Sequence, residues 1–144
     1  MKINKKFGKK IINLTSVLTG ATPIACNNEH FGRAENILAP GMGKNMGDGW
    51  ETRRSRGKNF DWLILKCATA GKINKIQIDT HHFKGNYPDK CSLQAAYLNA
   101  KISDKTIVKR SKKWKLLLNK VKLYTHKKHN RSEERRVGKE CRSR

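Results

Sequence analysis

The sequence predicts an all-β protein built as an antiparallel β-sandwich. Short apolar segments of strand length alternate with turns that contain Gly or Pro, and this spacing is typical of sandwich folds. No sustained spacing of three or four residues between apolar positions indicates a helix. The chain has 144 residues, of which 36% are hydrophobic, so we expect a single domain with a small core.

Residues 61–67 form the clearest strand, because the segment is apolar on both faces and therefore belongs near the centre of a sheet. A turn at Gly71 separates it from residues 72–79, where Ile76 and Ile78 share one face. We expect these two strands to pair with each other as a hairpin.

The remaining strand signals are weaker. Residues 11–26 favour β structure on both sides of Gly20, and residues 114–118 and 121–124 are strand candidates with basic outer faces. Residues 91–97 alternate along the chain, which predicts four inward-facing side chains. These are Cys91, Leu93, Ala95 and Tyr97.

The formal net charge of +22 is concentrated toward the ends of the chain. Residues 11–100 contribute only +4, whereas residues 1–10 contribute +5 and residues 101–130 contribute +10. Aromatic residues do not interleave with these basic runs in the way that a base-stacking surface requires. We therefore expect solvated basic ends and no nucleic-acid partner.

None of the four cysteines belongs to a CxxC pair, so neither a metal knuckle nor a redox motif is predicted. We interpret the cysteines as small apolar residues in a reducing, cytoplasmic compartment. No apolar run is long enough to predict a membrane span. Although lysines precede residues 11–25 and Cys26 follows them, as in a lipoprotein signal, Pro23 and several polar residues favour a segment of the domain.

Two dense polar blocks, residues 47–54 and 79–86, flank the two clearest strands. Acids, arginines, a histidine and an asparagine gathered at strand ends are what a site for a polar substrate requires. The candidate residues are Asp48, Glu51, Arg53, Arg54, Asp79, His82 and Asn86.

Each candidate also has a purely structural interpretation. Asp48 could cap a turn between its flanking glycines, and Glu51 could form an ion pair with a neighbouring arginine. Asp79 could simply end a strand, and His82 could be packed and bonded to the backbone. Asn86 follows a glycine and could hold a left-handed turn.

The two blocks, together with Glu-His-Phe-Gly at residues 29–32 and Asp-Trp at residues 61–62, resemble the allantoicase family. Allantoicases hydrolyse allantoate to ureidoglycolate and urea, and the similarity runs from about residue 12 to residue 130. The resemblance implies a jelly-roll, galactose-binding-like sandwich that corresponds to the second of two repeats in a subunit. The first repeat and the closing strands of the second are not recognisable here, so we expect the chain to be inactive or nearly so by itself. The complete enzyme is expected to be a homo-oligomer.

Allantoate is an anion with two ureido groups, so its hydrolysis requires a carboxylate anchor and acid–base groups. The resemblance implies that Glu51, Asp79 and His82 are catalytic. It further implies that substrate is bound by Asp48, Arg53, Arg54 and Asn86.

No metal or other cofactor is predicted. His81 and His82 would point to opposite faces of a strand and could not chelate together there. His126 and His129 are separated by two lysines, whose charge opposes a bound cation.

We predict three segments: a basic lead-in over residues 1–10, the allantoicase-like repeat over residues 11–130, and a foreign tail over residues 131–144. The tail resembles the conceptual translation of a common sequencing-adapter oligonucleotide. The main alternative for the whole chain is a non-catalytic jelly-roll module that binds a small polar ligand or another subunit. That alternative explains the strand pattern but not the density of acids, arginines and histidines in the two blocks.

Overall fold

The computed structural model describes residues 12–99, 101–132 and 140–143. Most of the ordered structure is β, in agreement with the predicted fold class, and the strands form a five-stranded and a two-stranded antiparallel sheet. The strands are β1 (Thr22–Cys26), β2 (Leu63–Lys66), β3 (Lys75–Asp79), β4 (Lys90–Ala96), β5 (Lys115–Lys122), β6 (Lys128–Ser132) and β7 (Glu140–Ser143). The helical segments are the 3-10 turns η1 (Val17–Thr19), η2 (Ala34–Leu38) and η3 (Met46–Asp48) and the α-helix α1 (Asp104–Ser111).

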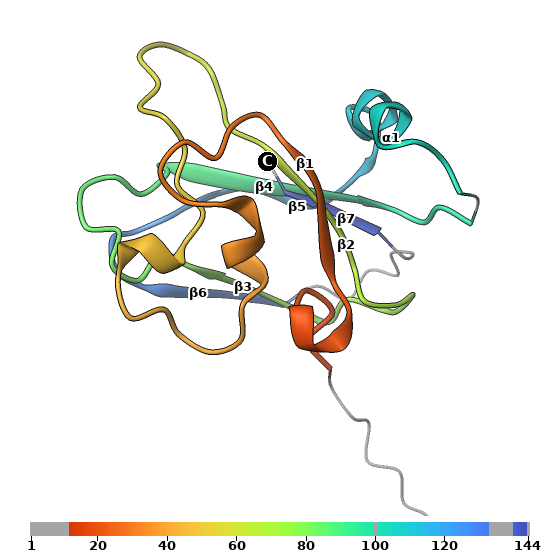
Figure 1. Cartoon of the computed structure of the whole chain (residues 1–144), viewed down its shortest axis with the longest axis horizontal. Coiled ribbons are helices and arrows are strands. Elements are labelled where there is room, and N and C mark those ends of the chain that lie inside the picture. The colour runs from red at the N-terminus through yellow and green to blue at the C-terminus, as the bar shows by residue number, and fades with distance from the viewer. Residues whose placement is uncertain (1–11, 100, 133–139, 144) are drawn as a thin grey trace, which may run out of the picture.

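The larger sheet has the order β1-β2-β7-β4-β5, and the smaller sheet pairs β3 with β6 (Figure 1). The two sheets pack face to face through a cluster that joins Ile76 of β3 to Ala95 of β4 and to Leu117 and Leu118 of β5. Because these side chains are removed from water between the sheets, the cluster supplies much of the driving force for the sandwich.

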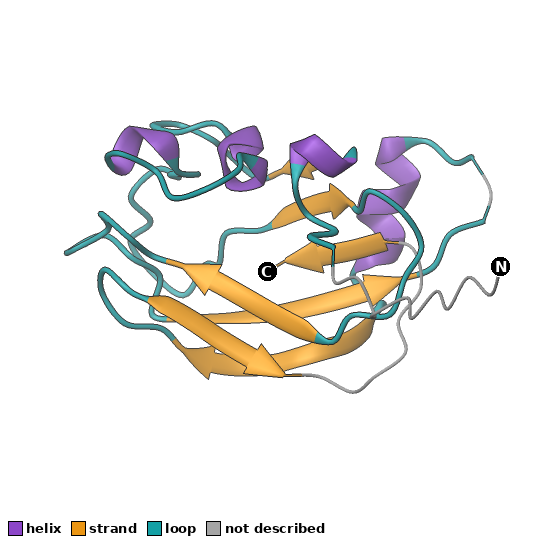
Figure 2. Ribbon diagram, turned by 90° about the horizontal axis from the view of Figure 1, so that it is seen from below, coloured by secondary structure: helices purple, strands orange, loops and turns teal. Residues whose placement is uncertain are grey.

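Strand β2 is central and buried on both faces, as predicted from its apolar run. Leu63 and Leu65 pack with Leu38 of η2 on one side, while Ile64 packs with Ile107 of α1 and with Trp114 on the other. The strand period of two residues places the leucines and the isoleucine on opposite faces. The helical segments gather along one side of the strands (Figure 2).

The predicted hairpin between residues 61–67 and 72–79 is wrong. β2 pairs with β1 and β7, whereas β3 crosses to the other sheet and pairs with β6. Short sequence separation favours a hairpin. However, β2 is a buried central strand, so the backbone groups along both of its edges must be paired, and β1 and β7 supply these partners.

Two further expectations differ from the structure in detail, and one element was not expected. Residues 114–118 and 121–124 contribute to one strand, β5, rather than two. Tyr97 follows the end of β4 and is exposed, and Ala95 is the member of its predicted inward set that is fully buried. Helix α1 was not predicted, because two turns are too short for a recognisable period. Its N-cap is Ser103, whose side chain accepts a hydrogen bond from the backbone of Thr106.

The predicted lead-in over residues 1–10 lies outside the described residues. Within the predicted tail, β6 continues to Ser132 and β7 lies between β2 and β4. The foreign origin of residues 131–144 therefore stays a prediction, although parts of the segment are paired in the sheets. No helix in the described ranges is both long and apolar enough to cross a membrane.

Candidate functional site

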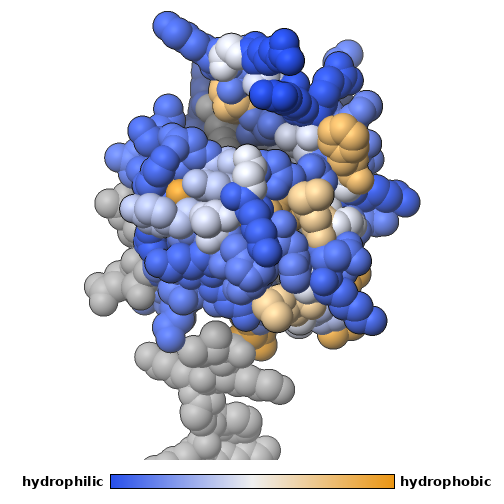
Figure 3. Space-filling view, turned by 90° about the vertical axis from the view of Figure 1, so that its left-hand side faces the viewer, coloured by the Kyte–Doolittle hydropathy of each residue, from blue (hydrophilic) through white to orange (hydrophobic). Residues whose placement is uncertain are grey.

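The two polar blocks of the sequence meet at one end of the sandwich. The loop after η2 and the loop between β3 and β4 contact each other through hydrogen bonds of His82 and Asn86. His82 Nε2 lies 2.7 Å from the carbonyl oxygen of Gly43, and the Asn86 amide donates to Glu51 Oε1 at 2.7 Å. This end of the molecule is largely hydrophilic, with scattered apolar side chains (Figure 3).

Glu51 is fixed by a backbone bridge to Gly32. The amide of each residue donates to the carbonyl of the other at 3.1 Å. A Cβ at position 32 would lie 2.3 Å from the carbonyl oxygen of Gly49, so only glycine allows this close approach. The bridge leaves the Glu51 carboxylate bonded to Asn86 rather than to Arg53 or Arg54.

Asp48 has the capping role that the sequence allowed as an alternative. Its carboxylate accepts hydrogen bonds from the backbone of Lys44 at 2.7 Å and of Asn45 at 3.4 Å. Asn45 in turn accepts from the backbone of Gly47, which completes a capping box around η3. Asp48 therefore shapes the loop that carries Glu51.

Asp79 is the last residue of β3, and its carboxylate orients His81. Its Oδ1 atom accepts from the backbone of His81 at 2.8 Å and lies 2.6 Å from His81 Nδ1. The Asp79 and His81 side chains are 33% and 23% exposed, so both remain accessible. β3 ends at Asp79, where the predicted strand of residues 72–79 also ends, and His81 and His82 lie in the turn that follows.

His126, from the loop between β5 and β6, completes what we call the histidine cluster: Asp79, His81, His82 and His126. The backbone of His82 donates to His126 Nδ1 at 2.8 Å, and the His81 and His126 ring centroids are 4.7 Å apart. Buried Thr80 fastens the two loops together, because its backbone and hydroxyl bond both the amide and the carbonyl of Lys127.

His82 and His126 both have left-handed backbone conformations, with φ of 70° and 47°. Such conformations cost a non-glycine residue about 1–3 kcal/mol and tend to occur at functional sites. Two left-handed residues in one cluster indicate that the surrounding contacts, rather than the local preference of the backbone, set the conformation of these loops.

The surroundings also lower the pKa of His126. Desolvation is the largest cause, followed by the positive charges of His81, Lys84 and His82, and Asp79 acts in the opposite direction. The neutral imidazole is the form that fits the structure, because Nδ1 must be unprotonated to accept from the His82 amide.

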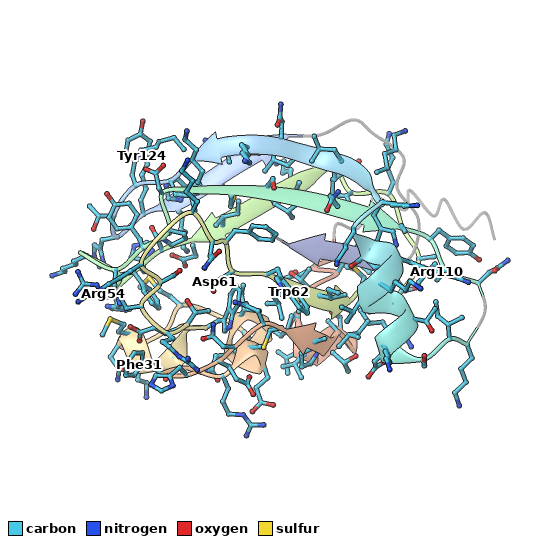
Figure 4. The ribbon with its side chains drawn as sticks, turned by 90° about the horizontal axis from the view of Figure 1, so that it is seen from above. Phe31, Arg54, Asp61, Trp62, Arg110 and Tyr124 are labelled. Carbon is cyan, nitrogen blue, oxygen red and sulfur yellow. The ribbon has the colours of Figure 1, made fainter. Side chains whose placement is uncertain are left out.

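Arg53 and Arg54 line a pocket whose lining residues include neither Glu51 nor Asn86. The pocket has a volume of about 490 Å³ and is also lined by Asn28, Asp61 and Trp62. Figure 4 shows Arg54 at the same end of the molecule as Phe31 and Tyr124, with Arg110 at the opposite end.

The acid in this pocket is already bonded to neutral donors. Asp61 accepts from Thr52 at 2.7 Å and from Asn27 at 2.6 Å. Within the described part of the chain, Arg53 and Arg54 form no ion pair. Their guanidinium groups thus remain exposed and able to bind an anion.

His129 is the exception among the nearby histidines, because it is 2% exposed and bonded through both ring nitrogens. Nε2 accepts from the backbone of Tyr124 at 2.8 Å, and Nδ1 lies 3.0 Å from the carbonyl oxygen of Ile78. Among the residues that the structure describes, no group of three or more His, Cys, Asp or Glu side chains could hold a metal ion.

Sequence reasoning missed His126 and the orientation of His81. The signal for His81 was its position two residues after Asp79, because an aspartate side chain in a turn commonly accepts a hydrogen bond from the backbone two residues later. His126 carries no comparable signal, because only the pairing of β3 with β6 brings it to the cluster.

Comparisons with known proteins agree with this architecture. The family model described as "Allantoicase repeat" matches residues 12–141. A probable allantoicase 1 from Burkholderia mallei is 49% identical over 83% of this chain, and a probable allantoicase from Photobacterium profundum is 47% identical over 80%. The crystal structure of allantoicase from Saccharomyces cerevisiae superposes with a TM-score of 0.78 at 30% identity and covers 92% of this chain.

The matches cover only part of each relative: 35% of the Burkholderia protein, 34% of the Photobacterium protein and 38% of the yeast chain. The chain thus spans about a third of the length of these curated relatives. The sandwich, the meeting of its two polar loops and the family match lead to one conclusion: the chain belongs to the allantoicase family.

Proposed function

We propose that this chain takes part in the hydrolysis of allantoate to ureidoglycolate and urea, as one repeat of an allantoicase. Membership of the family supports the reaction, and the loop end of the sandwich supports the location of the site. The observation that carries the location is the contact between Glu51 and Asn86, since it joins the two polar blocks through their side chains.

The residues at this end suit the chemistry of a ureide anion. Arg53 or Arg54 would hold the substrate carboxylate through a two-pronged hydrogen bond. The Asn86 amide can bind a ureido group, because it both donates and accepts hydrogen bonds. Asp48 supports these residues through the loop turn rather than by contact with substrate.

Glu51 and the histidine cluster supply the groups for general acid–base catalysis. Hydrolysis moves a proton from water toward the departing urea nitrogen, and a carboxylate or an imidazole can carry it. Asp79 and His82 belong to one connected network, while Glu51 reaches the same loop through Asn86.

The complete enzyme is proposed to combine this repeat with a preceding repeat of the same subunit, and to work as a cytoplasmic homo-oligomer. The 35% coverage of the Burkholderia relative supports a longer subunit. We expect little turnover from the 144-residue chain by itself.

The test is release of urea from allantoate by the full chain, alone and joined to the part of the Burkholderia mallei relative that it does not match. Urea release by the joined protein, above that of the relative's part alone, is the expected result. If the joined protein binds allantoate without releasing urea, the repeat is a binding module instead.

A further inference from the structure

The hydrogen bonds of the histidine cluster determine which ring nitrogens remain available for chemistry. His82 Nε2 donates to the carbonyl oxygen of Gly43 at 2.7 Å, which commits that nitrogen to holding the neighbouring loop. The His82 amide is committed as well, because it donates to His126 Nδ1. His82 therefore fixes the positions of its neighbours more than it faces a substrate.

His81 is arranged as an oriented base. A carboxylate 2.6 Å from Nδ1 makes that nitrogen the one that carries the proton, and it leaves the lone pair on Nε2. Among the described residues, His81 Nε2 has no hydrogen-bond partner. The side chain is 23% exposed, so solvent and a small substrate can reach it.

His126 offers the complementary group. Its Nδ1 accepts from the His82 amide, so in the neutral ring Nε2 carries the hydrogen and is a donor. The lowered pKa of His126 keeps this neutral donor form present near pH 7. The His81 and His126 rings lie 4.7 Å apart between centroids at an interplanar angle of 65°, so the cluster holds one acceptor nitrogen and one donor nitrogen on neighbouring rings.

We propose that His81, oriented by Asp79, is the general base of this site, and that the neutral His126 beside it donates a hydrogen bond to a ureido carbonyl of the substrate. This inference rests on the proposed function. It assigns to His81 and His126 the roles that the sequence analysis had given to Asp79 and His82. Asp79 and His82 become positioning residues.

The step balances with no further reactant. A water proton moves to His81 Nε2 while the water oxygen bonds to the central carbon of allantoate. The bond from that carbon to one ureido nitrogen breaks, and its electron pair remains on the nitrogen. The proton then passes from His81 through the Glu51 carboxylate to this nitrogen, which leaves as urea. The hydrogen bond from His126 helps to hold the ureido group as charge develops on it.

The first test needs no activity. Long-range ¹H–¹⁵N NMR of the full chain identifies the protonated nitrogen of each imidazole. We expect His81 to carry its proton on Nδ1 and His126 on Nε2 near pH 7, and we expect Asp79→Asn to disturb the His81 pattern. A His81 ring protonated on Nε2 and free on Nδ1 would overturn the proposal.

The second test is urea release by the joined protein described above. His81→Gln should lower kcat by about 10²–10⁴-fold with little change in KM, and it should remove the acidic limb from the pH profile of kcat/KM, where protonation of the base lowers activity. His126→Asn keeps an acceptor for the His82 amide and a donor for substrate, so it should retain much more activity than His126→Ala. Arg110→Gln, on α1 at the far end (Figure 4), is the matched surface control.

The two hypotheses fail in different ways. Absence of urea release by the unsubstituted joined protein would contradict the proposed function itself. Full turnover by His81→Gln, in a joined protein that does release urea, would contradict only the assignment of the base.

Discussion

His129 and the histidine cluster lie within a few residues of each other on the β3–β6 pair, yet their surroundings are opposite. His129 is paired with Ile78 in the ladder, is 2% exposed and uses both ring nitrogens for backbone contacts. His81 and His126 lie just beyond the strand ends, and each retains one ring nitrogen directed to no described partner.

The difference shows how the same residue type serves stability in one region and chemistry in the other. A buried polar ring must be fully bonded, because an unsatisfied group in the interior costs free energy. A ring at a loop end can be oriented by one bond and remain available through its other nitrogen. Substitutions in the two regions should therefore have separable effects on stability and activity.

The largest effect is expected for the site carboxylate. Glu51→Gln should lower urea release by the joined protein by about 10²–10⁴-fold, because the amide cannot exchange a proton. The free energy of unfolding should change by less than about 0.5 kcal/mol, as for other surface changes. Glu35→Gln, an exposed acid on η2, is the control. Wild-type turnover by Glu51→Gln would remove this residue from the site.

The core histidine should behave in the reverse manner. His129→Leu removes the ring nitrogens that bond the Tyr124 amide and the Ile78 carbonyl, and we expect a loss of about 2–4 kcal/mol in the free energy of unfolding. Urea denaturation followed by fluorescence measures this loss. Turnover per folded molecule should stay near the unsubstituted value, and its selective loss would place His129 in the chemistry after all.

The backbone bridge between Gly32 and Glu51 can be tested with a matched glycine pair. Gly32→Ala forces a Cβ against the Gly49 carbonyl, and should cost about 1–3 kcal/mol of stability and displace Glu51. At Gly85 an added Cβ meets nothing within 4 Å, so Gly85→Ala should be close to neutral. Equal stability of the two variants in thermal unfolding would contradict this geometry.

A smaller effect is expected at the arginine pocket. Arg54→Ala should raise KM for allantoate by about tenfold, the loss of one charge-assisted hydrogen bond, while kcat changes little. Arg110→Ala should leave both constants unchanged. A fall in kcat without a rise in KM would indicate that Arg54 acts on the transition state instead of anchoring the substrate.

The smallest effect is the pH dependence from His126. Because the pKa of His126 is lowered in the folded chain, the unfolded chain binds the proton more readily, and stability should fall as the pH drops below about 6.5. His126→Asn should weaken this dependence, relative to the unsubstituted chain, in unfolding measurements between pH 5 and about 8. An unchanged dependence would show that desolvation and the charges of His81, Lys84 and His82 do not bias His126 toward its neutral form.

The sequence predicted the fold class and the centre of the core from local signals. The apolar run that became β2 could be recognised because its burial on both faces appears directly in its composition. The strand partners could not be recognised, since the pairing of β3 with β6 depends on packing between distant segments. Strand β7 had no signal at all, because a charged segment such as residues 140–143 lacks the alternation of a strand.

The candidate site was predicted as two blocks but not as a network. Asn86 and Glu51 were named individually, and their hydrogen bond follows only from the fold. The pairing of Glu51 with an arginine, a reasonable expectation from sequence proximity, does not occur in the structure, because the bridge to Gly32 directs the side chain elsewhere. His126 became visible only through the register of β6.

The central claim is that the two loops and the histidine cluster form one ureide site. The most direct measurement is an NMR titration of allantoate into the uniformly ¹⁵N-labelled chain. We predict that the perturbed signals are confined to the loop end, including Glu51, Asn86, His81 and His126, and that His129 and α1 stay unperturbed. Perturbations centred on α1, or none at the loop end at millimolar allantoate, would contradict the account.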